Sequence, residues 1–179
     1  MRRAALVTSL IGCAILAVPL RLSGQSRVQQ ITAAFNKHKY AVKEHRGVTI
    51  EKYKDVRSEP VVKQNIGDYA GAYEVSGLGY AITLQVRADG TVQARGYDGD
   101  RLARPFDLKN ARIQGSLITA TKVYHDGTTE GFEGVFMNRT ERMSPTDPGV
   151  TTFGLGVVLR TPVELDGMTL DKLFYQLVR

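Results

Sequence analysis

The pattern that decides the fold of this chain is YAITLQVR at residues 80–87, followed by Asp89-Gly90. Large apolar residues at Tyr80, Ile82 and Leu84 alternate with small or polar ones, which is the period of a half-buried β-strand. Asp-Gly is a strong signal for a tight hairpin turn. The stretch therefore predicts a strand that turns directly into an antiparallel neighbour.

Strand patterns of the same kind continue along the chain. They occupy residues 69–75, 92–96, 102–108, 112–124, 132–137 and 153–159, with further Asp-Gly turns at 98–99 and 126–127. Pro105 has no N–H to donate, so its strand is expected at a sheet edge or with a bulge. Asn110 is expected to end this strand. Residues 170–177 fit a helix or a strand, and we favour a single turn followed by a strand. Several short strands joined by tight turns predict an antiparallel meander at residues 65–179, which removes its exposed edges by closing into a small barrel.

The segment before this domain has a helical period. Over residues 27–45 a set of residues recurs at three- and four-residue steps, namely Val28, Ile31, Phe35, His38 and Val42. Ser26 suits the start of a helix and Gly47 its end. Residues 48–56 follow as a charged strand or an extended connector, which the Ser-Glu-Pro at 58–60 interrupts. Residues 25–64 are thus expected to form a basic, amphipathic N-terminal helix and a connector.

The first barrel strands carry a resemblance to a known class of domain. YAGAYE at residues 69–74 and ITLQVRADG at 82–90 resemble the opening of small secreted lipocalin-like β-barrel domains, of the type appended to bacterial serine hydrolases of the penicillin-binding class. The resemblance covers roughly residues 68–140. It implies a barrel whose interior can hold a small apolar ligand. It transfers no catalytic residue, because the Ser-x-x-Lys nucleophile motif of those hydrolases is absent from this segment.

The N-terminus has the layout of a secretory signal peptide. Arg2 and Arg3 precede seventeen uncharged residues at 4–20, and a polar stretch follows, with cleavage expected after Gly24. Residues 1–24 therefore predict export to the periplasm or the extracellular space. Lipid attachment at Cys13 and an uncleaved signal anchor are the alternatives. Cys13 is the only cysteine, so removal of the signal peptide leaves no thiol for a disulfide, thiolate catalysis or a Cys-ligated metal.

The net charge of +6 is unevenly distributed along the 179 residues. Residues 1–24 contribute three positive charges, residues 25–64 a net of five, and residues 65–179 a net of two negative charges. This basicity is too local for a general nucleic-acid binder. In an exported protein it indicates contact with an anionic membrane or cell-wall surface. The expected contact residues are Lys37, Lys39, Lys43, Arg46, Lys52 and Lys54.

Catalytic and metal sites receive little support from the sequence. His125 lies beside Asp126 and near Glu130, but no activated nucleophile is identifiable next to them. Turn chemistry accounts for Asp98 and Asp126. Glu130 and Glu133 are three residues apart in a strand, so they face opposite sides. We predict no catalytic residue, no metal site and no cofactor.

Three functions remain open at this point. The first is a non-enzymatic binding module for an apolar small molecule or an envelope component. The second is a structural or assembly protein of the cell envelope with a filled core, and the third is a small-molecule enzyme that uses His125 with a carboxylate. An apolar cavity of a few hundred Å³ would favour the first. The residues expected to line such a cavity are Tyr80, Ile82, Leu84, Phe106, Phe132, Phe136, Phe153 and Leu155.

Overall fold

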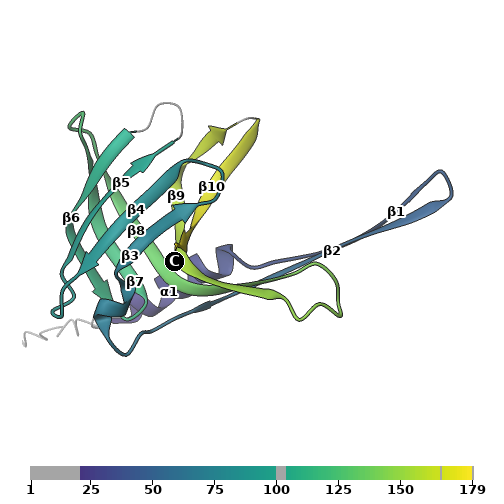
Figure 1. Cartoon of the computed structure of the whole chain (residues 1–179), viewed down its shortest axis with the longest axis horizontal. Helices are drawn as coiled ribbons and strands as arrows, with labels where there is room; N and C mark the ends of the chain where they lie inside the picture. Colours follow the sequence, from purple (N-terminus) through teal and green to yellow (C-terminus); the bar gives the residue numbers. More distant parts are fainter. Residues whose placement is uncertain (1–20, 100–103, 166, 179) are drawn as a thin grey trace, which may run out of the picture.

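The computed structural model describes residues 21–99, 104–165 and 167–178, and within these ranges the protein is mainly β (Figure 1). The helix α1 (Arg21–Ala34) and the 3-10 helix η1 (Ile66–Tyr69) accompany a single antiparallel sheet. The strands are β1 (Lys37–His45), β2 (Val48–Pro60), β3 (Gly71–Val75), β4 (Tyr80–Val86), β5 (Val92–Asp98), β6 (Arg104–Gln114), β7 (Leu117–Tyr124), β8 (Thr129–Arg142), β9 (Val150–Leu165) and β10 (Met168–Leu177).

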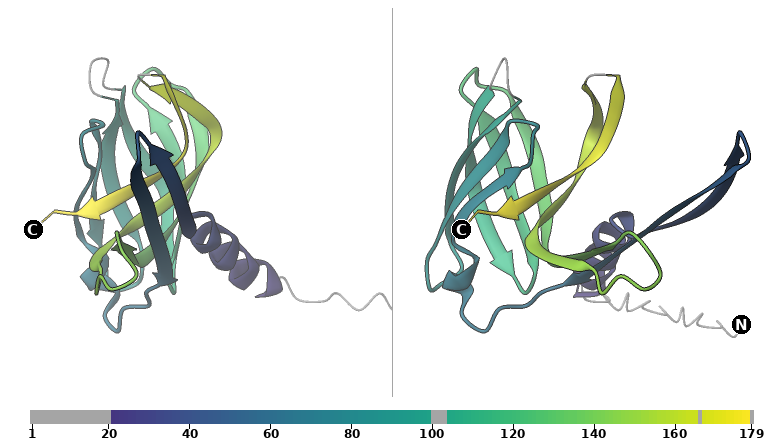
Figure 2. Two further views of the ribbon diagram at one scale, coloured as in Figure 1. Left: turned by 90° about the vertical axis from the view of Figure 1, so that its right-hand side faces the viewer. Right: turned by 45° about the vertical axis from the view of Figure 1, so that its right-hand side comes forward.

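Strands β3 to β10 form a closed, eight-stranded antiparallel barrel (Figures 1 and 2). Each strand pairs with the next along the chain, and β10 returns to β3. The closing register joins Gln176 to Glu74 and Leu177 to Tyr73. The predicted meander that closes into a barrel is therefore confirmed.

The barrel core follows from the alternation in the sequence. In β4 the residues Tyr80, Ile82 and Leu84 are buried, whereas Thr83 and Gln85 are exposed. The same alternation in the other strands directs one side chain in two inward. The interior is consequently packed with large apolar side chains from all eight strands.

One end of the barrel is closed by Tyr69 of η1. Its ring stacks on Phe136 at 4.3 Å between centroids. Its hydroxyl accepts a hydrogen bond from the Lys63 backbone N–H at 2.8 Å, and its one proton is shared between the carbonyls of Val61 and Gly115, each at 2.9 Å. A single buried hydroxyl thus joins the β2–β3 connector to the β6–β7 turn.

Helix α1 packs on the outside of the barrel (Figure 2). Ile31 and Phe35 are buried against Val135 of β8 and Met137 of β8, which face outward there. A helix is present at the predicted N-terminal position, with Ile31 on its buried side. It ends at Ala34, so the predicted extent over residues 27–45 is wrong beyond that residue, and the lysines of the predicted basic helix lie outside it.

Residues 37–45 form β1 instead, paired with β2 in a register that runs from Lys37↔Val56 to His45↔Val48. The turn between them has positive φ at Arg46 (52°) and Gly47 (76°), as two-residue hairpin loops require. Gly47, interpreted above as a helix end, is therefore a hairpin turn residue. Pairing with β2 over nine residues stabilises the extended conformation of residues 37–45 more than the spacing of a few apolar residues stabilises a helix.

This hairpin projects from the barrel as an arm, defined here as residues 37–54 (Figure 1). Only the last part of β2, from Asp55 to Pro60, pairs with β8. The predicted interruption at residues 58–60 is wrong, because these residues continue the strand. Pro60 is tolerated there because it is the last residue of β2 and has no ladder N–H to supply.

Three further details differ from or refine the sequence prediction. Asn110 does not end its strand: it adopts a positive φ of 54° at a register shift, and β6 continues to Gln114. The run at residues 112–124 is divided between β6 and β7. The C-terminal segment is a strand, β10, from Met168 to Leu177. The strand of the favoured alternative is confirmed, whereas a turn at the start of residues 170–177 is not found.

The predicted signal peptide, with Cys13, falls almost entirely on residues outside the described ranges and remains a prediction. Among the described residues, no helix has the length and apolar character needed to cross a membrane.

We expect Tyr69→Phe to destabilise the protein. The substitution keeps the ring on Phe136 but removes the hydroxyl partner of the part-buried Lys63 N–H and of the Val61 and Gly115 carbonyls, which costs about 1–3 kcal/mol. Urea unfolding followed by circular dichroism measures this loss. Tyr97→Phe, at a tyrosine that is 42% exposed, is the matched control and should change the free energy of unfolding little. Equal stabilities of the two variants would contradict the role given to the Tyr69 hydroxyl.

Candidate binding site at the barrel mouth

Four charged residues face the barrel interior at the end opposite Tyr69. They come from four consecutive strands: Asp98 from β5, Arg104 from β6, Lys122 from β7 and Glu130 from β8. Asp98 lies directly opposite Arg104 in the sheet register, and Lys122 lies opposite Glu130. Opposite charges at facing positions stabilise the sheet. The four form a polar rim above the apolar core.

Lys122 is the buried centre of this group, with only 5% of its side chain exposed. Its Nζ lies 2.6 Å from Asp98 Oδ2 and 3.3 Å from Glu130 Oε1. The ammonium also lies 4.3 Å from the centre of the Phe106 ring. A buried ammonium requires such partners, because losing its hydration is otherwise prohibitive.

The hydroxyl of Tyr124 completes the network. It lies 2.8 Å from Asp98 Oδ2 and 2.9 Å from Glu130 Oε1, and these two carboxylates share its one proton. Burial, and then the two carboxylates, raise the pKa of the Tyr124 phenol far above its usual value. Tyr124 therefore stays protonated and acts as a hydrogen-bond donor. Arg104 covers its ring at 4.0 Å.

One acceptor in this network is unused. Asp98 Oδ1 is buried and has no hydrogen-bond partner within the described part of the chain. Buried polar atoms are nearly always paired, so each exception requires an explanation. Asp98 lines a cavity, but its Oδ1 is itself buried, so a bound molecule would supply a donor to this oxygen only after a shift of the carboxylate.

The cavity has a volume of about 320 Å³ and opens at the barrel mouth. The charged network forms one wall. Apolar and aromatic side chains form the other, namely Tyr80, Phe132, Val157, Leu159, Leu173 and Tyr175. Burial, followed by the nearby Asp98, raises the pKa of Tyr175 well above its usual value, so this phenol is also neutral. The size suits a small organic molecule.

The residues predicted to line a ligand cavity are divided by the structure. Tyr80 and Phe132 line the mouth cavity. Phe153 is only partly buried and packs against the core from β9. The remaining five pack together in the interior: Ile82, Leu84, Phe106, Phe136 and Leu155. The deeper part of the barrel is thus occupied by side chains.

The charged network was not predicted from the sequence. Asp98 was assigned to turn chemistry, yet it shares the inward parity of Val92 and Ala94 in β5. Lys122 likewise shares the parity of Ile118 in β7. Both residues could have been identified from the sequence, because each is a charged residue at a position where the alternation of its strand predicts an inward-facing apolar side chain.

His125 is not assembled into an acid–base site at the mouth. It lines a separate outer depression beside Phe106 and does not contribute to the mouth cavity. Asp126 accepts bonds from Thr128 and Arg104, which lower its pKa to about 2. Glu130 faces the interior and Glu133 bonds to Arg27 outside, as their spacing predicted. No cluster of potential metal ligands occurs among the described residues.

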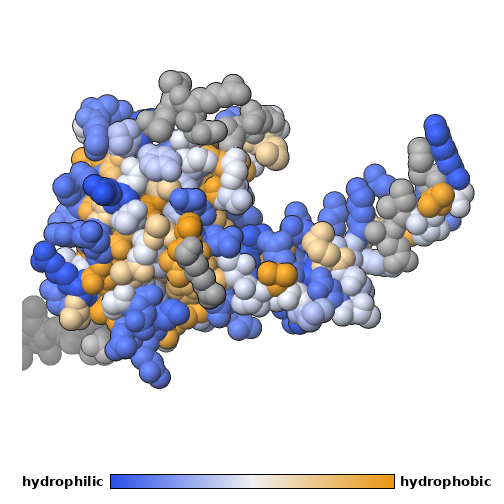
Figure 3. Space-filling model, in the orientation of Figure 1, coloured by the Kyte–Doolittle hydropathy of each residue, from blue (hydrophilic) through white to orange (hydrophobic). Residues whose placement is uncertain are grey.

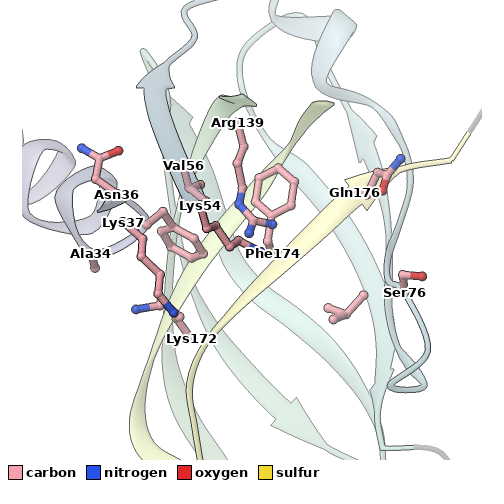
Figure 4. Close-up of a pocket in the computed structure, with 12 residues that line it drawn as sticks. Ala34, Asn36, Lys37, Lys54, Val56, Ser76, Arg139, Lys172, Phe174 and Gln176 are labelled. Carbon is pink, nitrogen blue, oxygen red and sulfur yellow. The ribbon is translucent and has the colours of Figure 1, made fainter. Parts of the chain in front are cut away.

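A second concave surface lies at the base of the arm, between α1, β2 and β10 (Figure 4). This groove of about 580 Å³ contains the rings of Phe35 and Phe174 and is basic around them. Arg139 lies over Phe174 at 5.2 Å and reaches Glu141 at 2.6 Å, and its buried Nε has no partner among the described residues. The basic residues that line the groove are Lys37, Lys54, Arg139 and Lys172.

The six residues predicted to contact an anionic surface all belong to the arm. Lys37, Lys39 and Lys43 are in β1, Lys52 and Lys54 are in β2, and Arg46 is in the turn.

Comparison of the chain with protein-family models, with curated proteins and with solved structures found no match. The function of both surfaces is therefore argued from their own chemistry.

We expect Lys122→Met to destabilise the protein by about 3–5 kcal/mol, because it leaves the Asp98 and Glu130 carboxylates close together without a cation. Adding Asp98→Asn should recover part of this loss, since one of the two charges is then removed. Urea unfolding of the single and double variants measures the coupling. Lys109→Met on the outer face of β6, 61% exposed, is the control. Additive effects of the two substitutions would contradict the pairing.

The tyrosines predict a loss of stability at alkaline pH. Burial raises the pKa of Tyr69, Tyr73, Tyr80, Tyr124 and Tyr175 above that of an unfolded chain. Above about pH 10 the unfolded chain loses phenolic protons that the native state keeps, so the free energy of unfolding should fall as the pH rises. Below that pH these phenols are protonated in both the folded and the unfolded states, so they should not contribute to the pH dependence of the free energy of unfolding.

Tyrosinate absorbance and urea unfolding at pH 8–12 measure this behaviour. Tyr175→Phe should make the fall less steep, whereas Tyr97→Phe at an exposed position should not. Titration of all tyrosines near pH 10 in a protein that remains folded would exclude the mechanism.

Proposed function

We propose that this protein is an exported, non-enzymatic binding protein that holds a small amphiphilic molecule at the mouth of its barrel. The observation that carries the proposal is the pairing, within one cavity, of an apolar wall with the Asp98–Lys122–Tyr124–Glu130 network. Export is inferred from the predicted signal peptide.

The network supports binding rather than catalysis. Lys122 and Tyr124 donate to the two carboxylates, and Arg104 bonds to Asp126. Groups engaged in this way are held in place and mutually neutralised. A nucleophile activated by a base within hydrogen-bond reach, which covalent catalysis requires, is not present in the described network.

The charge balance of the network indicates the class of ligand. Asp98 and Glu130 offset Arg104 and Lys122, so this network is neutral. Of the other charged residues that line the cavity, Arg27 is paired with Glu133, and Arg160 adds one positive charge. A ligand with a net charge would leave that charge poorly compensated in a partly buried site. A neutral head group that donates hydrogen bonds, such as a hydroxyl or an amide, suits the unused Asp98 Oδ1. The apolar wall around Phe132 and Leu173 suits a short hydrocarbon body.

A ligand series with a common eight-carbon chain tests this proposal. We expect octanamide and 1-octanol to bind more tightly than octanoate and octylamine in isothermal titration calorimetry, because only the first two have a neutral donor head. Asp98→Asn should weaken octanamide binding about tenfold or more, since a hydrogen bond to a charged acceptor is lost.

Asp107→Asn makes the same substitution on the outer face of β6, where the side chain is 46% exposed, and should leave the affinity unchanged. Leu159→Trp should reduce binding of all four compounds by filling the mouth. The proposal fails if the wild-type protein binds none of them, or if Asp98→Asn binds octanamide as well as the wild type does.

A second candidate is a structural or assembly protein of the envelope. It is favoured by the filled lower barrel and by the long arm, which extends beyond the strands that support it. In that case the mouth cavity would be unused. Co-purification of a stoichiometric envelope protein with both the wild type and Leu159→Trp would favour this function over ligand binding.

A further inference from the structure

The register of the arm sorts its charges onto two faces. Residues directly opposite each other in an antiparallel pair point to the same side, and successive residues alternate. Lys37 and Lys39 therefore share a face with Lys54, which lies opposite Lys39. Lys43 and Lys52 have the same parity and lie further along the arm. This lysine face consists of Lys37, Lys39, Lys43, Lys52 and Lys54.

The opposite face has a different composition. Glu44 and Asp55 lie there, together with Tyr40 and its cross-strand partner Tyr53. Asp55 is held by His38 at 3.3 Å and Arg57 at 3.1 Å on the same side. Acidic and aromatic residues are thus confined to one face of the arm. Among the side chains that the structure describes, the lysine face of residues 37–54 carries no carboxylate.

The lysine face is maintained at an electrostatic cost. Lys39 and Lys54 are directly opposed, and like charges at facing positions destabilise a hairpin. Lys54 has one counter-charge, Glu141 of β8 at 3.3 Å. Lys37, Lys39, Lys43 and Lys52 are exposed to solvent. Figure 3 shows the arm as a largely hydrophilic projection from the barrel. An external layer of negative charge would relieve this repulsion.

The basic surface continues from the arm into the groove at its base. Lys37 and Lys54 belong to both, and Arg139 and Lys172 extend the positive charge onto the barrel (Figure 4). The groove offers the unpaired Arg139 Nε next to the Phe174 ring. A basic pocket beside an exposed basic face matches an array of anionic head groups better than a single anion.

We propose that the lysine face docks the protein onto an anionic lipid bilayer. Two rows of lysines on one face of a two-stranded ribbon match an array of phosphate head groups, and each lysine near such a surface adds about fivefold to the partition coefficient. Lysine also interacts as a point charge and requires no fixed bidentate geometry. Nucleic acid is a poorer match, because Tyr40 and Tyr53, which could stack on bases, lie on the opposite face.

Vesicle co-sedimentation of the full chain tests this inference. We expect binding to vesicles of phosphatidylcholine with 30% phosphatidylglycerol, weaker binding to pure phosphatidylcholine, and a loss of the difference in high salt, where surface charges are screened. Replacement of Lys39, Lys43 and Lys52 by Gln should lower the partition onto anionic vesicles by about a hundredfold. These three lysines do not line the groove or contact the barrel.

The matched control removes the same net charge from exposed positions of the barrel, by Arg87→Gln in the β4–β5 turn, Arg95→Gln on β5 and Lys109→Gln on β6. It should lower the partition less than threefold, a limit set by weak long-range electrostatics. Both triple variants have the same N-terminal segment, so any contribution of that segment cancels.

Three outcomes would overturn the inference. One is an equal loss of binding in both triple variants, which would indicate a general charge effect. Another is an unchanged partition after the arm substitutions. The third is binding of the wild type to soluble polyphosphate without binding to anionic vesicles, which would assign the face to a phosphate polymer. None of these outcomes depends on the mouth cavity, so the proposed ligand binding is tested separately.

Discussion

Closure of the barrel is the constraint on which the rest of the structure depends. The strand β10 meets β3 over a short register at Gln176 and Leu177, with one further bond from the Val178 N–H to the Ala72 carbonyl at 2.8 Å. This short seam joins the last strand to the first. Because closure gives every barrel strand two neighbours, it removes free edges and separates an inside from an outside. Once the barrel is closed, alternate residues of each strand point inward, and this alternation decides which side chains are buried.

The same closure explains how a barrel interior can hold four charges. At the end near Tyr69, aromatic and aliphatic side chains fill the space between the strands. At the other end Lys122 finds Asp98 and Glu130 on neighbouring strands, so its desolvation is compensated by contacts that the curved sheet brings together. A flat sheet would place these groups in one exposed layer. The cavity at the mouth lies where the apolar filling ends and the charged network begins.

Strand β8 links the barrel to the arm. One edge of β8 is occupied first by β7 and then by β2, and the change falls at Phe136, whose N–H bonds to the Ser116 carbonyl and whose carbonyl accepts from the Val61 N–H. The strand is longer than the barrel requires, and the excess supports the arm. One strand thus positions two surfaces of different chemistry, the cavity at the mouth with its paired charges and the lysine face outside.

The sequence alone determined that the protein is a meander of antiparallel strands, because alternation and Asp-Gly turns are local signals, as in YAITLQVR before Asp89-Gly90. It also located the basic segment and the absence of a thiol after Cys13. Pairing partners are not local signals. The spacing of apolar residues from Val28 to Val42 therefore predicted a helix where Lys37 in fact pairs with Val56. Tertiary structure decided that Asp98 and Lys122 share a buried site and that five lysines share one face. Both results depend on register and closure, which bring together residues that are far apart along the chain.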